Sequence, residues 1–374
     1  MKKGLYIHIP FCPYKCHYCD FLTFVNADGM VEKYVEYLKR EINFYRGKKI
    51  EIDSIFIGGG TPSYIDSKYI KDIMLEVYSV FEVDADSEIS IEMNPNTISK
   101  TKIEDYLEVN INRFSLGVQT FDDEILKILG RGHKRIDIIK DIKMMRGSGV
   151  KNISIDMMMG NPKQDMDILK FDVSNALSLN VEHISYYSLI LEERTLFEYW
   201  LKHGKIELFD DDLEREMYHF VKTKLKENGY QHYETSNFAK EGKKSRHNMK
   251  YWNLSPYIGV GLGAASNIGL KRFKNFTKFK NYFDSIDNGK LPIMEVEKLN
   301  MEEREKEFII MNLRMMDGFS IPKINDKFGI DFIEKYKDII KKHCEFGNVK
   351  IENERFMFTE RGIDLSNQFY VDII

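Results

Sequence analysis

Three of the four cysteines fall within one short segment, Cys12-Pro13-Tyr14-Lys15-Cys16-His17-Tyr18-Cys19, with the spacing C-x3-C-x2-C. Thiolates this close together on a tight loop can hold a single polynuclear metal centre. A [4Fe–4S] cluster that only transfers electrons takes four protein ligands, so three cysteines leave one iron open to a substrate or cofactor. We therefore expect Cys12, Cys16 and Cys19 to ligate a [4Fe–4S] cluster in a loop spanning residues 10–21.

Two other interpretations of the cysteines stay open at this point. Zinc is the first, with His8 or His17 completing a tetrahedral site, although structural zinc sites usually add a second cysteine pair that this sequence lacks. Reduced thiols without a metal are the second. A disulfide framework belongs to small secreted chains, and Cys344 is isolated in the sequence and is best interpreted as an incidental free thiol.

Composition indicates an ordinary globular protein of about two or three domains. The chain has 374 residues, 43% of them hydrophobic and 30% charged, and a formal net charge of −4, which gives no reason to expect nucleic acid as a partner. The apolar run 5–9 is too short for a secretion signal, and no run approaches the length of a membrane span. These features predict a cytoplasmic protein with reduced thiols.

From residue 5 onwards, short β-rich runs alternate with longer amphipathic segments, which favours βαβ units and a parallel sheet. The predicted strands are 5–9, 54–57, 88–93, 113–118, 152–157 and 183–189, and the predicted helices between and after them are 30–44, 68–81, 98–109, 122–128, 136–148 and 164–179. Six such units are too few for a complete eight-fold barrel and fit an open, partial one.

Polar and glycine residues follow five of these strands. They are Cys12 after the first, Gly58-Gly59-Gly60-Thr61-Pro62 after the second, the segment 92–95 after the third, Gln119 after the fourth and the segment 156–162 after the fifth. Ligand sites in barrel-like α/β folds assemble at the C-terminal ends of parallel strands. The sequence therefore predicts one site at this end of the sheet.

The cysteine loop after the first strand, together with Gly58–Pro62 after the second, resembles the radical S-adenosylmethionine superfamily. The resemblance implies that the open iron chelates the amino and carboxylate groups of S-adenosylmethionine, and that one electron from the cluster cleaves the sulfonium to give a 5′-deoxyadenosyl radical. Glycines allow backbone N–H groups to approach the methionine part closely. A glycine run alone is a weak indication, but its position after the second strand supports the resemblance.

The chain is also similar to a narrower group, the oxygen-independent coproporphyrinogen III oxidases. The similarity rests on Tyr6-Ile7-His8-Ile9-Pro10-Phe11-Cys12, on the segment 117–121 and on the segment 156–164, in which Asn161-Pro162 replaces the usual Leu-Pro. By this pattern the S-adenosylmethionine contacts are Tyr6, Tyr18, Gly59, Gly60, Thr61 and Glu92, and Gln119, Arg131 and Asp156 match contacts to a second S-adenosylmethionine. The structural alternatives are strand-end caps or ion pairs for Glu92 and Asp156, and a charge at a helix C-terminus for Arg131.

Two departures place the chain nearer the haem chaperone (HemW-like) branch of that group. Phe21 occupies the position of a further cysteine in the oxidases, and the N-terminal extension of the oxidases is missing before the first strand. The segment Arg246-His247-Asn248-Met249-Lys250-Tyr251-Trp252 carries HNxxYW, which resembles the haem-associated motif of the branch. It implies His247 as an iron ligand and Tyr251 and Trp252 as porphyrin contacts; the alternative is a loop packed on the barrel.

The resulting hypothesis is a haem chaperone that carries a [4Fe–4S] cluster and S-adenosylmethionine. It would bind haem as cargo and deliver it to acceptor proteins, including membrane-associated respiratory proteins, with the option of a cluster-dependent homodimer. It predicts no coproporphyrinogen oxidase activity. The alternatives are that oxidase, which makes protoporphyrinogen IX by radical decarboxylation, and a radical S-adenosylmethionine oxidoreductase with an unrelated substrate.

The expected fold is α/β, a partial (βα)6 TIM-like barrel of the radical S-adenosylmethionine type with a small, mainly helical, winged-helix-like C-terminal domain. The expected domains are the barrel over residues 1–210, an extension covering it over 211–295 that contains the HNxxYW segment, and the terminal domain over 296–374.

Overall fold

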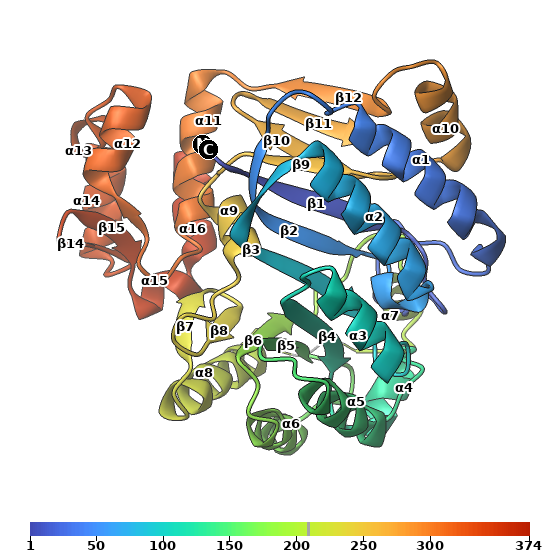
Figure 1. The fold of residues 1–374 in the computed structure, drawn as a ribbon. Coiled ribbons are helices and arrows are strands. Elements are labelled where there is room, and N and C mark those ends of the chain that lie inside the picture. The colour runs from blue at the N-terminus through green and yellow to red at the C-terminus, as the bar shows by residue number, and fades with distance from the viewer. Residues whose placement is uncertain (208–209) are drawn as a thin grey trace.

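A computed structural model describes residues 1–207 and 210–374 (Figure 1). Its central strands are β1 (Lys3–Ile9), β2 (Glu51–Gly59), β3 (Glu82–Met93), β4 (Arg113–Gln119), β5 (Ile153–Met159) and β6 (His183–Ser188). The helices that alternate with them are α1 (Val31–Asn43), α2 (Ser67–Val80), α3 (Lys100–Glu108), α4 (Asp123–Ile128), α5 (Arg135–Gly147) and α6 (Met166–Ser178). All six strands are parallel neighbours in chain order, so the predicted partial barrel is confirmed.

The chain after β6 extends this sheet at both edges. The elements are α7 (Leu196–Lys202), α8 (Asp211–Glu227), β7 (Gln231–Glu234), β8 (Asn237–Ala239), α9 (Arg246–Trp252), β9 (Tyr257–Val260), β10 (Ala265–Ile268), β11 (Lys271–Asn275), α10 (Phe279–Asp287) and β12 (Ile293–Lys298). β8 and β7 follow β6 in antiparallel pairing, whereas β9 lies parallel to β1 and leads to β10, β11 and β12. The residues expected to cover the barrel thus contribute five strands, and the first half of β12, to a sheet of twelve. The domain boundaries at 210 and 295 stay a prediction.

A second hydrophobic core organises the C-terminal residues, drawn in orange to red in Figure 1. Its elements are α11 (Met301–Asn312), β13 (Phe319–Ser320), α12 (Ile321–Phe328), α13 (Phe332–Lys335), α14 (Lys337–Glu345), β14 (Val349–Glu352), β15 (Arg355–Phe358), α15 (Glu360–Asp364) and α16 (Ser366–Ile373). Strands β14 and β15 form an antiparallel hairpin, and the small, mainly helical unit is confirmed. No helix among the described residues is long and apolar enough to cross a membrane.

Buried polar contacts fix helix α1 to the sheet beside the C-terminal end of β1. The carboxylate of Glu41, which is buried, accepts hydrogen bonds from the Gly261 N–H at 2.8 Å, the Asn275 side chain at 2.7 Å and the Tyr282 hydroxyl at 2.5 Å. The hydroxyl of Tyr34 donates to the His8 carbonyl at 2.6 Å. These contacts hold β1 and the segment after β9 in one place.

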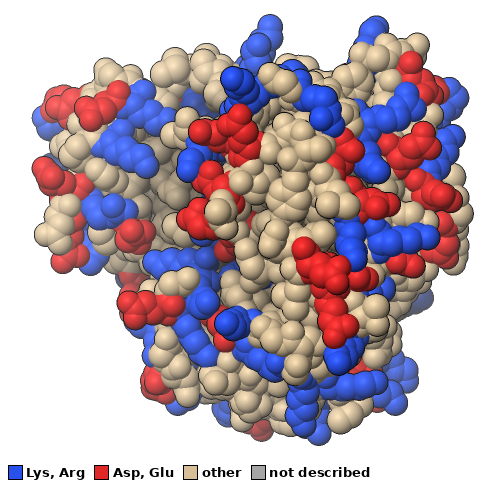
Figure 2. All heavy atoms as spheres, in the orientation of Figure 1, with Lys and Arg blue, Asp and Glu red and all other residues tan. Residues whose placement is uncertain are grey.

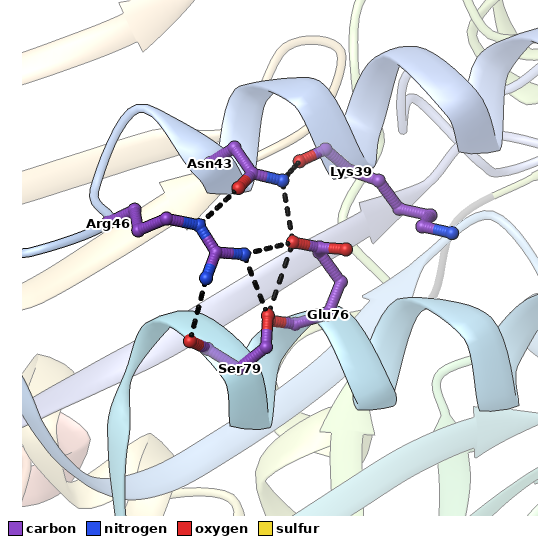
Figure 3. Close-up of polar contacts among 5 residues, drawn as sticks. All are labelled: Lys39, Asn43, Arg46, Glu76 and Ser79. Atoms are coloured by element: carbon purple, nitrogen blue, oxygen red, sulfur yellow. Dashed lines mark hydrogen bonds and ion pairs between the residues drawn. The ribbon is translucent and has the colours of Figure 1, made fainter.

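The outer side of α1 carries a different polar network, which joins it to α2 (Figure 3). The Glu76 carboxylate accepts hydrogen bonds from Asn43 at 2.6 Å and from the guanidinium of Arg46 at 2.9 Å, and Arg46 also reaches the Ser79 hydroxyl at 3.0 Å. Because Arg46 is largely exposed, water competes for these bonds.

The face of the molecule in Figure 2 mixes the two signs of charge. Lysine and arginine side chains alternate with aspartate and glutamate over the described residues of this face, and no continuous basic surface spans it. This distribution agrees with the net charge of −4. That nucleic acid is not a partner stays a prediction.

Replacing Glu41 with Ala should destabilise the protein far more than replacing Glu76 with Ala. The first change leaves the buried Gly261 N–H and Tyr282 hydroxyl without an acceptor and removes one of the two acceptors of the Asn275 amide, so it should lower the free energy of unfolding by about 3 kcal/mol or more. The second removes partly exposed contacts and should lower it by about 1 kcal/mol or less. Urea unfolding of both variants checks this, and equal losses would contradict the assignment of Glu41 as a buried anchor.

Candidate functional site

The cysteine loop follows β1 and is held on both sides by backbone hydrogen bonds. The Cys12 N–H donates to the Phe24 carbonyl at 3.0 Å, and the Phe24 N–H donates to Pro10 at 2.7 Å, so the loop closes on itself. His17 fixes the middle of the loop, because its N–H donates to the Leu129 carbonyl at 3.0 Å and its ring Nδ1 bonds the Ile128 carbonyl at 2.8 Å. The loop is therefore attached to the end of α4.

The glycine segment after β2 packs directly against the cysteine loop. The Gly60 N–H donates to the Ile9 carbonyl and the Thr61 N–H donates to the Phe11 carbonyl, both at 2.8 Å. A Cβ on Gly60 would lie 2.7 Å from the Phe11 oxygen, so a side chain here would push the two loops apart. As a result, the Cys12 sulfur lies 3.4 Å from the Thr61 hydroxyl.

The three clustered cysteines are free thiols, and all three line one cavity of about 390 Å³. Burial raises the pKa of Cys12 to about 11 and also raises the pKa of Cys19, so a metal that binds them must displace protons. Among the described residues, no group of three His, Cys, Asp or Glu side chains is spaced to hold a single metal ion. Three cysteines that each bond a different iron of a cluster do not need such close spacing.

The two histidines of the zinc interpretation, His8 and His17, form hydrogen bonds to other groups of the protein. His8 bonds the Tyr6 hydroxyl through Nδ1 at 2.9 Å and the Leu22 carbonyl through Nε2 at 3.0 Å, and burial lowers its pKa to about 4. Nδ1 of His17 bonds Ile128, and its ring packs edge-on against Trp200. Their positions favour structural roles over metal ligation.

Most of the predicted S-adenosylmethionine contacts line this same cavity. Those that do are Tyr18, Gly59, Gly60, Thr61, Glu92, Gln119, Arg131 and Asp156. Tyr6 is the exception, because it does not belong to the lining and its hydroxyl bonds His8 behind the glycine segment. Side chains from β2 to β6 thus meet the cysteine loop in one space, although their roles toward a ligand stay a prediction.

Two acidic groups with raised pKa values line the cavity. Burial raises the pKa of Glu92 to about 7, and the nearby charge of Asp156 adds to this effect. Its Oε2 accepts the Gly59 N–H at 3.0 Å, so the carboxyl is fixed beside the glycine segment. Burial also raises the pKa of Asp156, whose Oδ2 accepts from the Ser115 hydroxyl at 3.1 Å. An ammonium or hydroxyl of a ligand would find acceptors here.

Arg131 connects the cysteine loop to the strands. One guanidinium nitrogen donates to the Asn94 side chain at 2.6 Å and to the Gly117 carbonyl at 2.5 Å, and another lies 3.5 Å from the Cys16 sulfur. Its Nε is buried and has no hydrogen-bond partner. Gln119, at the end of β4, has a left-handed backbone with φ of 72°, a strained conformation that turns the strand end into the site.

The interior of the barrel is unusually polar and was not foreseen from the sequence. In a closed TIM barrel this space is filled by bulky branched residues. Here the inward positions of consecutive strands carry serines, namely Ser54, Ser90, Ser115, Ser154 and Ser185, and the last three line the cavity. The lining also includes Arg113, His183, Tyr187 and Asn248. Alternation along β4, which places Arg113, Ser115 and Gly117 on one face, is the pattern that would have revealed this interior.

The HNxxYW residues lie mostly outside the cavity. His247 is completely buried; its Nδ1 bonds the Ser54 hydroxyl and its Nε2 bonds the Tyr251 hydroxyl, both at 3.0 Å. Trp252 packs under the guanidinium of Arg314, 4.4 Å from the ring centre, and so joins α9 to the C-terminal unit. This is the packed-loop arrangement of the alternative interpretation. Haem contact by His247, Tyr251 or Trp252 stays a prediction, and it requires these contacts to open.

Comparison with known proteins matches residues 6–171 to the radical SAM superfamily and residues 299–365 to the HemN C-terminal domain. The heme chaperone HemW of Bacillus subtilis is 35% identical over 98% of both chains, and that of Escherichia coli is 36% identical over 71% of this chain and 70% of its own. The structure of the coproporphyrinogen III oxidase HemN from Escherichia coli superposes with a TM-score of 0.86 at 22% identity, covering 100% of this chain and 90% of that one.

The cysteine loop, the glycine segment and the partial barrel are thus found together in a chain that aligns end to end with curated relatives. The HemN likeness adds that the whole chain has the same fold. On these grounds the chain belongs to the HemW family within the radical SAM superfamily.

Proposed function

We propose that this protein is a haem chaperone that binds haem and passes it to acceptor proteins while carrying a [4Fe–4S] cluster and S-adenosylmethionine. The observation that carries the proposal is the meeting of three free thiols with Glu92 and Asp156 in one cavity. The relatives named heme chaperone, which align over nearly the whole chain, support the cargo. Delivery to membrane-associated respiratory proteins and a cluster-dependent homodimer are finer parts of the same proposal.

The donor set around the cavity fits a cluster with one open iron. Cys12, Cys16 and Cys19 would hold three irons, and the charge of Arg131, beside the Cys16 sulfur, would offset the negative charge of the thiolates. Bound there, the cluster would supply an electron to S-adenosylmethionine. Glu92 would accept a hydrogen bond from the methionine amino group, and Asp156 would accept one from a hydroxyl of the ligand. Tyr18 would close the cavity beside the loop.

The entrance of the cavity favours a large apolar cargo. Phe21 and Ile190 belong to the lining, yet they are 62% and 69% exposed. Exposed apolar side chains at the rim of a polar cavity can cover the face of a porphyrin, whereas S-adenosylmethionine needs no such surface. We propose this rim as one of the places where haem contacts the protein.

Anaerobic reconstitution followed by two assays separates the chaperone from the oxidase. Titration with haemin should give a saturable Soret change. Coproporphyrinogen III supplied with S-adenosylmethionine and a reductant should give no vinyl product, because the cargo is carried and not converted. Protoporphyrinogen formation over many turnovers would refute the proposal, and so would the absence of saturable haemin binding.

A Cys16→Ala variant should lose the iron–sulfur cluster, because the two remaining thiols cannot hold it. The expected result is loss of the broad visible absorption and of most of the iron bound after reconstitution, with an unchanged circular dichroism spectrum. Cys344→Ala is the matched control, since this exposed thiol lies in the C-terminal unit, and it should bind iron like the parent. A cluster retained in Cys16→Ala would contradict the ligand assignment.

A Glu92→Gln variant should bind S-adenosylmethionine about tenfold or more weakly, because a charged hydrogen bond becomes a neutral one. The pKa of Glu92 is raised to about 7, so ionisation of the parent carboxylate should strengthen binding as the pH rises through this value. This part of the pH dependence should disappear in the variant. Calorimetry on reconstituted protein measures both, and identical pH profiles would contradict the role of Glu92.

A further inference from the structure

Arg113 lies at the inner end of the cavity, far from the cysteine loop. It is the first residue of β4, it is only 2% exposed, and it shares the inward face of the strand with Ser115, Gly117 and Gln119. At about 3.3 Å per residue, the six steps from Arg113 to Gln119 span about 20 Å. The cavity therefore reaches from the cluster loop along the whole length of this strand.

The guanidinium of Arg113 has little to offset its charge. One nitrogen donates to the Lys243 carbonyl at 3.0 Å, and the described residues offer it no further hydrogen bond and no ion pair. Asp156 and Arg113 interact only through space: the charge of Arg113 lowers the pKa of the Asp156 carboxyl, but the two side chains are not in direct contact. A buried cation that is not directly bonded to an anion is costly unless a ligand completes the site.

The side chains that line the cavity next to Arg113 are polar and uncharged, and the buried Glu88 carboxylate on the neighbouring strand β3 forms no ion pair with it but accepts the His247 N–H at 3.0 Å. His183 uses both ring nitrogens, bonding the Ser154 hydroxyl and the Tyr233 hydroxyl at 2.8 Å each, and burial holds its pKa well below the usual value. It therefore stays neutral beside Arg113. The hydroxyl of Ser245 and the side-chain amide of Asn248 also line this end of the cavity. A fixed guanidinium among hydroxyl and amide groups is suited to binding a carboxylate.

We propose that Arg113 anchors a carboxylate subsite at the inner end of the cavity, with Ser154, Ser245 and Asn248 around it. The ligand group is an alkyl carboxylate. Resting on the proposed function, its source is a propionate of haem, because the carboxylate of S-adenosylmethionine is expected to bind the open iron at the opposite end of the cavity. The subsite would fix the orientation of a ligand that enters from the rim, because the cation of Arg113 lies at the inner end of the polar cavity.

A ligand without free carboxylates tests the subsite. Reconstituted full-length protein is titrated with haemin and haemin dimethyl ester by Soret absorption. The parent should bind the free acid, haemin, at least about tenfold more tightly than the ester. Arg113→Gln should weaken binding of that acid about 10- to 100-fold and leave the carboxylate-free ligand unchanged.

Two further variants separate recognition from folding. Arg113→Lys keeps the charge but loses the planar fork, so its affinity for the acid should lie between parent and Arg113→Gln. Arg304→Gln is a matched control: Arg304 is also buried, yet it is paired with Glu307 in the C-terminal unit, so its affinities for haemin and the ester should equal those of the parent. If Arg113→Gln does not fold, the subsite is still tested by the ratio of the parent's affinities for haemin and its ester and by the affinity of Arg113→Lys for haemin.

The results that overturn the subsite differ from those that overturn the haem proposal. Equal affinities of the parent for haemin and its dimethyl ester, or a loss in Arg113→Gln that is the same for acid and ester, would reduce Arg113 to a positioning residue for Asp156. A parent that binds neither haemin nor its ester refutes the proposed cargo, whereas a parent that binds both equally refutes only the subsite.

Discussion

The rest of the site depends on two backbone hydrogen bonds between the C-terminal ends of β1 and β2 and the residues that follow them. They run from the Gly60 N–H to Ile9 and from the Thr61 N–H to Phe11, and they bring the glycine segment against the cysteine loop. Gly59 has a φ of 111° and Gly60 lies against the Phe11 backbone, so residues with side chains would break the contact. The free thiols and the carboxyl of Glu92 face one cavity because these two loops are joined.

The second constraint is the small, polar inward face of the barrel. Serines on consecutive strands leave the interior open. Charged side chains lie at both ends of it, among them Glu92, Asp156 and Arg131 toward the loop and Arg113 at the opposite end. An interior of branched apolar residues would have given a stable core with no room for ligands. Stability is supplied instead by the helices outside the sheet and by buried anchors such as Glu41.

The sequence predicted the parts of this arrangement that depend on local pattern. The six parallel strands were visible as β-rich runs, and the cysteine spacing and the glycines pointed to one edge of the sheet. The strands β9 to β12 were missed because they are short, and β11 and β12 carry many charged side chains at the sheet edge. Their pairing depends on contacts far apart in sequence. His247 was assigned to haem from its motif, yet its burial follows from packing against Ser54 and Tyr251, which no local pattern reveals.

The central claim is that the three thiols hold a cluster whose open iron faces the same cavity as Glu92. Electron paramagnetic resonance of the reduced, reconstituted protein, recorded before and after addition of S-adenosylmethionine, tests it most directly. The account predicts a [4Fe–4S] signal whose g values shift when S-adenosylmethionine binds the open iron. A cluster spectrum that S-adenosylmethionine leaves unchanged, or the absence of a cluster in the reconstituted parent, would contradict it.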